Sequence, residues 1–368
     1  MKPKRILKWS ALAILLILFA WFEYAYWSST NDCATLASVP QNPMKAIRYC
    51  EYGPPDVLKL VDVEKPVPND NQALIKVRAA ALNPLDLQFG GHPIARLMFG
   101  VRKPKDTRFG TDYSGTVEAV GKNVTDFKVG DEVFGAARGA VARYVCALHD
   151  RGIAIKPANV TFEQAGSVAI AGLTALQGLR DAGKTQAGQK VLINGASGGI
   201  GTFAVQIAKS YGAEVTGVCS TRNIDLVKSI GADHVIDYTK EDFTKEEQRY
   251  DMIFDLISNH SFSERKKILT PNGICVLAGI GGAGWHEDQW SRLIGTFTGP
   301  VRSRFSSQKF VMCMTRLTKQ DMTVFRELME SGKVKPVIDR TFKLTEVQDA
   351  VRYLDTGHAR GKVVITIE

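Results

Sequence analysis

A glycine-rich loop at residues 195–201, with the sequence GASGGIG, contains the residues best suited to chemistry. It follows an apolar strand-like run and opens an amphipathic helix-like run, which is the context that a dinucleotide-binding loop requires. Gly198 and Gly201 occupy the last two positions of the three-glycine fingerprint, and Ala196 replaces the first. We expect Gly198 to let the backbone approach a pyrophosphate at the helix N-terminus, and Gly201 to let the helix pack closely on the strand. The cofactor-binding residues predicted in this loop are Ala196, Ser197, Gly198, Gly199, Ile200 and Gly201.

The type of dinucleotide is indicated by the end of the second strand, roughly 20 residues further on. A carboxylate at that point would bind the adenosine 2′-hydroxyl of NAD. This sequence has Cys219-Ser220-Thr221-Arg222 there, with no acid. A hydroxyl and a guanidinium suit a 2′-phosphate, so Ser220 and Arg222 favour NADPH over NADH, although Arg222 could also be a solvated residue at a helix start. Tyr238, after the third strand, is expected either to flank the adenosine ribose or to be a buried structural tyrosine.

Two kinds of region must position this loop. Residues 44 to 150 consist of short strand-like runs broken by Gly and Pro, which indicates a small, strongly curved sheet. From residue 161 onward helices and strands alternate, which indicates a parallel, doubly wound sheet. The sequence thus predicts an α/β fold with a β-rich catalytic domain and a doubly wound Rossmann domain. A continuous helix is expected over residues 162–179, and the last parallel strand over SQKFVMCM, residues 307–314.

The predicted domain boundaries follow from this change of rhythm. The β-rich catalytic domain is assigned residues 44–164 and 330–368, and the Rossmann domain residues 165–329. A polar, turn-rich linker is assigned residues 28–43.

The first 27 residues combine a basic start with an apolar run. Trp9 to Phe22 are 14 uncharged residues, which as a helix extend about 21 Å. That length is short of the roughly 30 Å hydrocarbon core, but with Lys8 and Glu23 snorkelling the segment Ile6–Trp27 could span it. We predict an N-terminal membrane helix over residues 1–27, with a cleaved signal peptide or an interfacial helix as alternatives.

The side of the membrane on which the body lies is left open. Basic residues before the apolar run favour a cytoplasmic N-terminus, which would put the body on the opposite face. A body that depends on a nicotinamide cofactor favours the cytoplasmic face instead.

Composition excludes several classes of protein. The chain has 368 residues, of which 45% are hydrophobic and 23% charged, values that exclude general disorder, collagen-like sequence and multi-span membrane proteins. The net charge is +9. Its basic clusters at 92–108 and 302–316 lack interleaved aromatics, so we expect no nucleic-acid partner and interpret them as solvated loops. The six cysteines are far apart without a CxxC pair, so neither a metal cluster nor a disulfide framework is expected.

Four further stretches, together with the glycine loop, make residues 44–368 resemble the medium-chain dehydrogenase/reductase superfamily. They are GTVEAVGKNVTDFKVGDEVFG, AGLTALQGL, SIGADHVIDY and GKVKPVIDRTFKLTEVQDAVRYL, followed by a C-terminal return ending GHARGKVVITIE. The loop also resembles that of short-chain dehydrogenases, but no Tyr-x-x-x-Lys follows it. The resemblance implies that the β-rich catalytic domain is of the GroES-like kind.

Within that superfamily the chain is similar to the zinc-free quinone oxidoreductase branch, which includes zeta-crystallin-like reductases. The zinc-dependent branch carries a Cys ligand, a His-Glu pair and a cysteine-rich lobe. In their places stand Asn83, Thr111-Asp112 and no cysteine cluster. We therefore expect no metal.

Without a metal, hydrogen-bond donors must stabilise charge that develops on a substrate oxygen. The predicted catalytic residues are Asn83 and Tyr113, although Asn83 could simply hold a turn before a proline and Tyr113 could be a core aromatic. Asp86 and Asp112 are interpreted as acids that cap local backbone. The resemblance implies three further cofactor-binding residues, Thr174, Asn259 and Gly279. Lys362, near the C-terminal return, is expected either to face a cofactor phosphate or to belong to an exposed basic turn.

The expected activity is hydride transfer from NADPH to a quinone or an activated enone. The expected substrate is thus a small hydrophobic quinone or carbonyl compound. A zinc-free alcohol dehydrogenase or aldehyde reductase, and a non-catalytic NADPH-binding membrane protein, remain alternatives. The resemblance also implies a possible homodimer joined through the SQKFVMCM strand.

Overall fold

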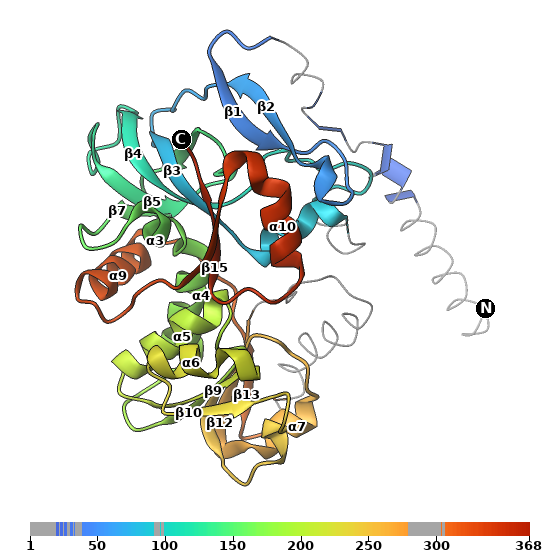
Figure 1. The fold of residues 1–368 in the computed structure, drawn as a ribbon, viewed down its shortest axis with the longest axis vertical. Coiled ribbons are helices and arrows are strands. Elements are labelled where there is room, and N and C mark those ends of the chain that lie inside the picture. Colours follow the sequence, from blue (N-terminus) through green and yellow to red (C-terminus); the bar gives the residue numbers. More distant parts are fainter. Residues whose placement is uncertain are drawn as a thin grey trace, which may run out of the picture.

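The computed structural model describes residues 39–91, 99–278 and 306–368 continuously, with isolated positions between 20 and 33 and at 96 and 303 (Figure 1). Most of the predicted membrane helix at 1–27 lies outside the described residues, and so does Gly279. Within the part of the chain that is described, no helix is both long and apolar enough to cross a membrane. The N-terminal anchor therefore stays a prediction.

A mainly antiparallel sheet of seven strands forms the β-rich domain. Its order is β14-β15-β3-β4-β5-β7, and β6 also pairs with β3. These strands are β3 (Gln72–Leu82), β4 (Asp112–Val120), β5 (Glu132–Ala136), β6 (Tyr144–Leu148), β7 (Ile153–Ile155), β14 (Ile338–Lys343) and β15 (Lys362–Thr366). Because β15 lies between β14 and β3, the two ends of the body build one domain, as the GroES-like prediction required.

Smaller elements surround this sheet. A separate antiparallel pair is formed by β1 (Pro43–Arg48) and β2 (Lys59–Glu64). The helical elements are η2 (Pro55–Val57), η3 (Pro84–Gly90), η7 (Leu344–Glu346) and α10 (Val347–Asp355). Helix α10 packs its apolar face, including Val351, into the same hydrophobic core as Ile75 and Val363 of the sheet.

The second domain contains a six-stranded, wholly parallel sheet in the order β10-β9-β8-β11-β12-β13. Its strands are β8 (Lys190–Asn194), β9 (Glu214–Cys219), β10 (His234–Asp237), β11 (Tyr250–Asp255), β12 (Leu269–Leu277) and β13 (Lys309–Met312). The helices of this region are α5 (Gly199–Ser210), α6 (Ile224–Ser229), α7 (Phe262–Lys267) and α9 (Lys319–Glu330), with the short turns η5 (Thr221–Asn223) and η6 (Phe243–Lys245). This is the doubly wound arrangement that the alternating sequence predicts. Figure 1 shows it below the β-rich domain, with β15 (red) near the boundary.

The predicted helix over 162–179 is divided in two, which corrects that expectation. Helix α3 (Phe162–Gly166) ends, α4 (Ala169–Gln177) begins, and a π-helical turn η4 (Gly178–Ala182) follows. The division has a tertiary cause, because the Asp112 carboxylate from β4 accepts a hydrogen bond from the Ile170 N–H in the first turn of α4 (3.0 Å). An acceptor placed at free N–H groups favours a helix start there.

The structure also contains one disulfide, between Cys33 and Cys50, whose Cα atoms are 5.8 Å apart. The spacing of the cysteines in the sequence does not predict it. The other four cysteines are free thiols.

Candidate active site

The glycine loop joins β8 to α5 through a tight turn. Gly195 has φ +91°, which a residue with a side chain rarely adopts, so the turn places its strained position before Ala196 rather than on it. Ala196 is not among the residues with positive φ, which explains why the first fingerprint position tolerates a methyl group. A Cβ on Gly201 would lie 2.1 Å from the Gly195 carbonyl oxygen. Close packing of helix on strand therefore requires Gly201, as the sequence predicts.

The start of α5 remains open to an approaching ligand. A Cβ on Gly198 would meet nothing nearer than the Gly195 oxygen at 3.5 Å. Gly198 is also bridged to Gly361, so the C-terminal return lies directly beside the loop. A Cβ on Gly199 would lie 3.2 Å from Lys362 Cδ, which places the stem of Lys362 against the N-terminus of α5.

The head of Lys362 enters a buried polar cluster of the β-rich domain. Lys362 Nζ donates to Asn83 Oδ1 (2.6 Å) and to Asp112 Oδ2 (3.4 Å). Asn83 Nδ2 donates to the same Asp112 oxygen (3.0 Å). The backbone N–H of Asn83 donates to Asp86 Oδ2 (2.7 Å), and Thr111 Oγ1 donates to Asp86 Oδ1 (3.2 Å). We call the four residues Asn83, Asp86, Asp112 and Lys362 the lysine cluster; all four are almost wholly buried.

Three neighbouring strands bring the lysine cluster together. β15 pairs with β3, and β3 pairs with β4. In this register Leu82 lies opposite Val363 and Ala81 lies opposite Asp112. The end of β3 and the starts of β4 and β15 therefore lie side by side at one end of these three strands. That end faces the glycine loop through the Gly198–Gly361 contact.

The electrostatics of the cluster are dominated by burial. Burial raises the pKa of Asp86 to about 7, against the N–H of Asn83, which lowers it. Burial also raises the pKa of Asp112, while Lys362 opposes that shift. Both carboxyls thus lack water, and one ammonium is close enough to bind Asp112 directly.

Asp86 and Asp112 both accept backbone hydrogen bonds, as the sequence predicts, but only Asp86 does so locally. Asp112 reaches Ile170, 58 residues away. Its neighbour Tyr113 is fully buried in the hydrophobic core of the β-rich domain. Adjacent strand residues face opposite sides of a sheet, so Asp112 and Tyr113 cannot both reach the cluster, and the structure places Tyr113 away from it.

Thr174 lies on α4, one turn after Ile170. Its Oγ1 donates to the Ile170 carbonyl (2.7 Å) and is hydrogen-bonded to Thr315 Oγ1 (2.5 Å). Thr315 follows β13, and sequence reasoning missed it because its partner lies 141 residues earlier. The pair connects the end of the Rossmann sheet to the helix that Asp112 caps.

Asn259 lies over the ends of two central strands. Asn194 Nδ2, at the end of β8, donates to Asn259 Oδ1 (3.0 Å) and to Asp255 Oδ1 (2.9 Å). Asp255 is in turn paired with the buried guanidinium of Arg265 (2.6 Å). Since Asn194 directly precedes Gly195, this network holds Asn259 beside the glycine loop.

The predicted adenosine side lies at the end of β9. Arg222 is exposed, and its Nη2 donates to the His358 carbonyl of the C-terminal return (2.6 Å). Tyr238 is 56% exposed, which excludes the interpretation of a buried tyrosine. Asn223 donates to both Ser197 Oγ and Ser220 Oγ, at 3.0 and 3.1 Å.

Asn223 also has a polar atom without a partner. Its Oδ1 is buried and accepts no hydrogen bond within the protein. Asn223 is not predicted from the sequence, although its place three residues after Ser220 is a usable signal. An acceptor in this position fits a hydroxyl or amide of a bound dinucleotide.

An acid near the adenosine side, Asp237, already accepts hydrogen bonds from threonine side chains of the protein. Asp237, at the end of β10, accepts hydrogen bonds from Thr221 Oγ1 (2.5 Å) and Thr239 Oγ1 (2.7 Å). The hydrogen bond from Thr221 lowers its pKa to about 2, although partial burial opposes the shift. Asp237 is therefore a charged structural acid that binds its own loop through Thr239 and the turn after β9 through Thr221.

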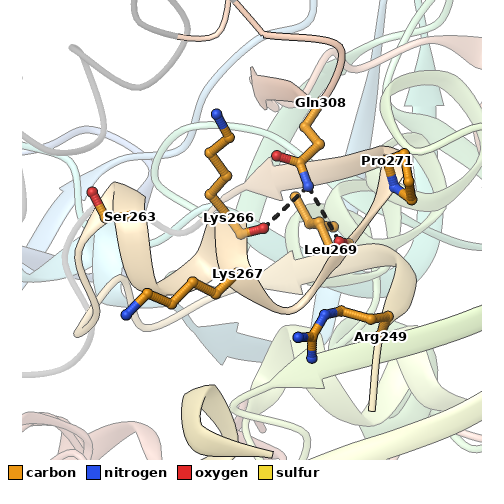
Figure 2. Close-up of a pocket in the computed structure, with 7 residues that line it drawn as sticks. All are labelled: Arg249, Ser263, Lys266, Lys267, Leu269, Pro271 and Gln308. Carbon is orange, nitrogen blue, oxygen red and sulfur yellow. Dashed lines mark hydrogen bonds between the residues drawn. The ribbon is translucent and has the colours of Figure 1, made fainter. Parts of the chain in front are cut away.

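The described residues contain no group of three or more His, Cys, Asp or Glu side chains arranged to hold a metal ion. They do contain a cavity of about 550 Å³ lined by Arg249, Ser263, Lys266, Lys267, Leu269, Pro271 and Gln308 (Figure 2). It lies near the starts of β11 and β12, whereas the glycine loop lies at the opposite ends of the strands. This cavity is separate from the candidate site.

The fold and site together define a two-domain, dinucleotide-binding oxidoreductase. The family model for the alcohol dehydrogenase GroES-like domain matches residues 69–157, and the zinc-binding dehydrogenase model matches residues 230–365. A 2-methylene-furan-3-one reductase of Solanum lycopersicum is 35% identical over 353 residues, which cover 92% of this chain and 82% of the relative. Quinone oxidoreductase of Homo sapiens is 30% identical over 344 residues, covering 89% and 99%.

A solved structure of the quinone oxidoreductase from Coxiella burnetii agrees with this fold. It has a TM-score of 0.76 and 32% identity, covering 89% of this chain and 100% of that chain. The chain belongs to the medium-chain dehydrogenase/reductase superfamily, in its quinone oxidoreductase branch. It is an oxidoreductase of a family that binds a nicotinamide cofactor.

The residues present fit such a cofactor. The open start of α5 at Gly198 suits a pyrophosphate, and the orphaned Asn223 Oδ1 offers an acceptor beside it. Ser220, Arg222 and Tyr238 would hold the adenosine end. Thr174, Asn259 and Lys362 lie along the remainder of the same edge.

Proposed function

We propose that the protein is an NADPH-dependent, zinc-independent reductase of quinones or activated enones. The observation that carries the proposal is the buried Lys362 ammonium, bound to Asn83 and Asp112 beside the glycine loop. The names of relatives support the substrate class, since they include a quinone oxidoreductase and an NADPH-dependent alkenal/one oxidoreductase of Arabidopsis thaliana, the latter 35% identical over 348 residues, covering 89% of this chain and 81% of the relative.

When bound, NADPH supplies the hydride, and the oxygen of the conjugated acceptor gains negative charge. Lys362 provides the compensating positive charge in a site that excludes water. An ammonium has three N–H donors, and Asn83 and Asp112 use two of them. The third remains for an oxygen of substrate or cofactor, and Asn83 and Asp112 fix its direction. A fixed donor in a dry site stabilises a developing oxyanion more than mobile water does.

The preference for NADPH is supported by charge. Arg222 is exposed beside Ser220, and Asp237 on the neighbouring strand accepts hydrogen bonds from Thr221 and Thr239. A 2′-phosphate would thus meet a cation and hydroxyls instead of a carboxylate.

The test is NADPH oxidation by the protein against a panel of quinones, enones and unconjugated aldehydes. We expect turnover of the conjugated acceptors, and Lys362→Met should lower kcat/KM by roughly 10²–10³-fold, the usual effect of removing an oxyanion donor. Lys156→Met is the matched control, because Lys156 is also a buried lysine but binds Glu132 and the carbonyls of Pro157 and Val160. Turnover of simple aldehydes alone, or full activity of Lys362→Met, would contradict the proposal.

We propose in addition that residues 1–27 anchor the protein to a membrane. The support is the uncharged run Trp9–Phe22 and the aromatic residues that follow it. The full chain should stay in the membrane pellet after an alkaline carbonate wash. A chain lacking residues 1–38 should be recovered in the supernatant; recovery of both forms in the supernatant would refute the anchor.

A homodimer joined along β13 is the assembly we propose. Strand β13 is an edge of the Rossmann sheet in the described part of the chain, and an edge strand presents unpaired backbone groups to another strand.

A further inference from the structure

We infer that the catalytic body lies on the oxidising face of its membrane, where the Cys33–Cys50 disulfide ties the membrane-proximal segment to the β-rich domain. The inference depends on the proposed anchor, and it selects the face opposite to the one that dependence on a nicotinamide cofactor favours.

The disulfide belongs to a built contact. Besides the covalent bond, Asn31 Nδ2 donates to the Cys50 carbonyl (2.9 Å), and the Cys33 N–H donates to Asn31 Oδ1 (3.3 Å). The Cα separation of 5.8 Å is the usual one for a disulfide. Residues 31 and 33 are therefore held against the chain directly after β1.

The six cysteines of the chain, all of which are described, divide sharply. Only Cys33 and Cys50 are paired. Burial raises the pKa of the Cys146, Cys219 and Cys313 thiols to about 11, so these groups stay protonated and poorly reactive. The Cys33–Cys50 pair is half-buried and forms a bond, whereas the other four thiols stay free. A disulfide of this kind is typical of a protein that matures where disulfides persist.

The charge around the apolar run indicates the same face independently. Lys2, Lys4, Arg5 and Lys8 precede Trp9–Phe22, and such an excess of basic residues favours the cytoplasmic side. The chain after the run then lies on the opposite side. In cells the non-cytoplasmic side is the oxidising one, so charge and disulfide agree.

Further contacts near the disulfide hold the N-terminal segment against the β-rich domain. The Arg102 guanidinium lies 5.6 Å from the ring centre of Tyr26 and 5.8 Å from that of Trp27. Tyr52, two residues after Cys50, donates to the Gly100 carbonyl (2.7 Å). In Figure 1 the blue N-terminal turn lies beside this part of the β-rich domain.

The part of the β-rich domain that these contacts reach is close in sequence to a residue of the candidate active site, Asn83. A Cβ on Gly91 would contact the Tyr52 side chain, and Gly91 directly follows η3, whose first residue follows Asn83. Trp27 is 68% exposed, and exposed aromatics of this kind prefer the membrane interface. The disulfide and these contacts thus hold the chain around Cys33 near the end of η3, the element that follows Asn83.

Formation of the bond is a two-electron oxidation. The Cys33 and Cys50 thiols together lose two protons and two electrons, and the S–S bond forms. The electron acceptor is a protein disulfide of a thiol–disulfide oxidase, which becomes a dithiol.

A thiol count on the full chain in its native membrane tests the bond. Cells are quenched with acid, free thiols are blocked with N-ethylmaleimide under denaturing conditions, and the protein is reduced and labelled with maleimide–polyethylene glycol. We expect two additions in the wild type and in the matched control Cys146→Ser. We expect none in Cys33→Ser or in Cys50→Ser, because the partner thiol freed by either substitution is blocked before reduction. No addition in the wild type would overturn the inference.

A surface cysteine tests the face. Lys122 has a 72% exposed side chain on a turn of the β-rich domain, so Lys122→Cys can be labelled by a membrane-impermeant maleimide in sealed vesicles of known orientation. We expect labelling only when the non-cytoplasmic face is outward; labelling with the cytoplasmic face outward would overturn the inference. NADPH oxidation in detergent reports separately on the proposed reaction, so the two can fail independently.

Discussion

Asp86 and Asp112 place two carboxyl groups in one water-free cluster with a single ammonium, that of Lys362. Asp112 has the ammonium as a direct partner at 3.4 Å, whereas Asp86 accepts only from the Asn83 N–H and Thr111. Burial without a cation in direct contact is the reason that the pKa of Asp86 rises to about 7. At the residue scale, the Asp86 carboxyl of the lysine cluster therefore titrates within the physiological pH range.

The stability of the protein should depend on the protonation of Asp86. Its pKa rises from 3.8 to about 7 on folding, so the folded state favours the protonated form. That contribution is complete below pH 4 and is lost as the pH rises through 7, by as much as about 4 kcal/mol. Thermal unfolding from pH 4 to 8 should show wild type losing stability relative to Asp86→Asn.

Asp349→Asn, at a surface carboxylate that is 69% exposed, is the control and should follow the wild type at every pH. A difference between wild type and Asp86→Asn that stays constant over the range would show that Asp86 does not titrate there.

Arg222 should decide between the two nicotinamide dinucleotides. Arg222→Ala removes the cation proposed to meet the 2′-phosphate, so KM for NADPH should rise about tenfold or more, the effect of losing about 1.4 kcal/mol or more of a charge-assisted contact. KM for NADH should be unchanged. Arg249→Ala, a basic residue of the cavity in Figure 2, is the control and should leave both values unaltered. An equal loss for both cofactors would contradict the assignment.

At the element scale, the turn from β8 into α5 requires glycine at two positions for two different reasons. Gly195 supplies the positive φ, and Gly201 supplies the room for helix on strand. Gly198 does neither, because its φ of −83° suits any residue and the space around its Cα is free. The conformation and surroundings of residue 198 would permit a side chain. The glycine there is therefore explained by the cofactor pyrophosphate that we expect to approach this position.

Alanine at two glycines should separate folding from binding. Gly201→Ala should be strongly destabilised, since its Cβ would overlap the Gly195 carbonyl. Gly198→Ala should melt close to the wild type but bind NADPH at least tenfold more weakly, because the methyl group would occupy the approach of the pyrophosphate. Calorimetry and a fluorescence titration measure the two effects. Unchanged binding by Gly198→Ala would place the pyrophosphate elsewhere.

At the scale of the whole molecule, strand β15 completes the first domain and also brings the chain back to the cofactor loop. Lys362 begins β15, and its neighbour Gly361 contacts Gly198. A C-terminal truncation would therefore remove both a central strand and the lysine of the site. Strand β13, the last strand in the order of the Rossmann sheet, has no partner strand beyond it among the described residues.

The proposed dimer can be broken at that edge. The Cys313 N–H donates inward to Leu277, so by alternation the Met312 N–H points outward. Met312→Pro removes an outward donor and should convert a dimer into a 40.4 kDa monomer in light scattering. Met314→Ala, beyond the end of β13, should stay dimeric. A wild type that is monomeric at micromolar concentration would contradict the proposal.

The sequence by itself determined the features that depend on local spacing. Periodicity predicted the order of the two domains and the six parallel strands, the last of them expected over residues 307–314 and observed at Lys309–Met312. It could do so because each strand or helix is formed by neighbouring residues. The glycine spacing predicted that Gly201 packs against the turn, and the lack of an acid after β9 was visible directly.

Only the tertiary structure decided which side chains meet. Lys362 reaches Asn83 across 279 residues, and Thr315 reaches Thr174 across 141. Strand register decides these pairs, and it also turns Asp112 toward the cluster and Tyr113 into the core, a choice that composition cannot make. The Cys33–Cys50 bond and the division of the helix at Ser167 have the same origin. Each depends on a partner distant in sequence, and only the assembled sheets bring that partner into contact.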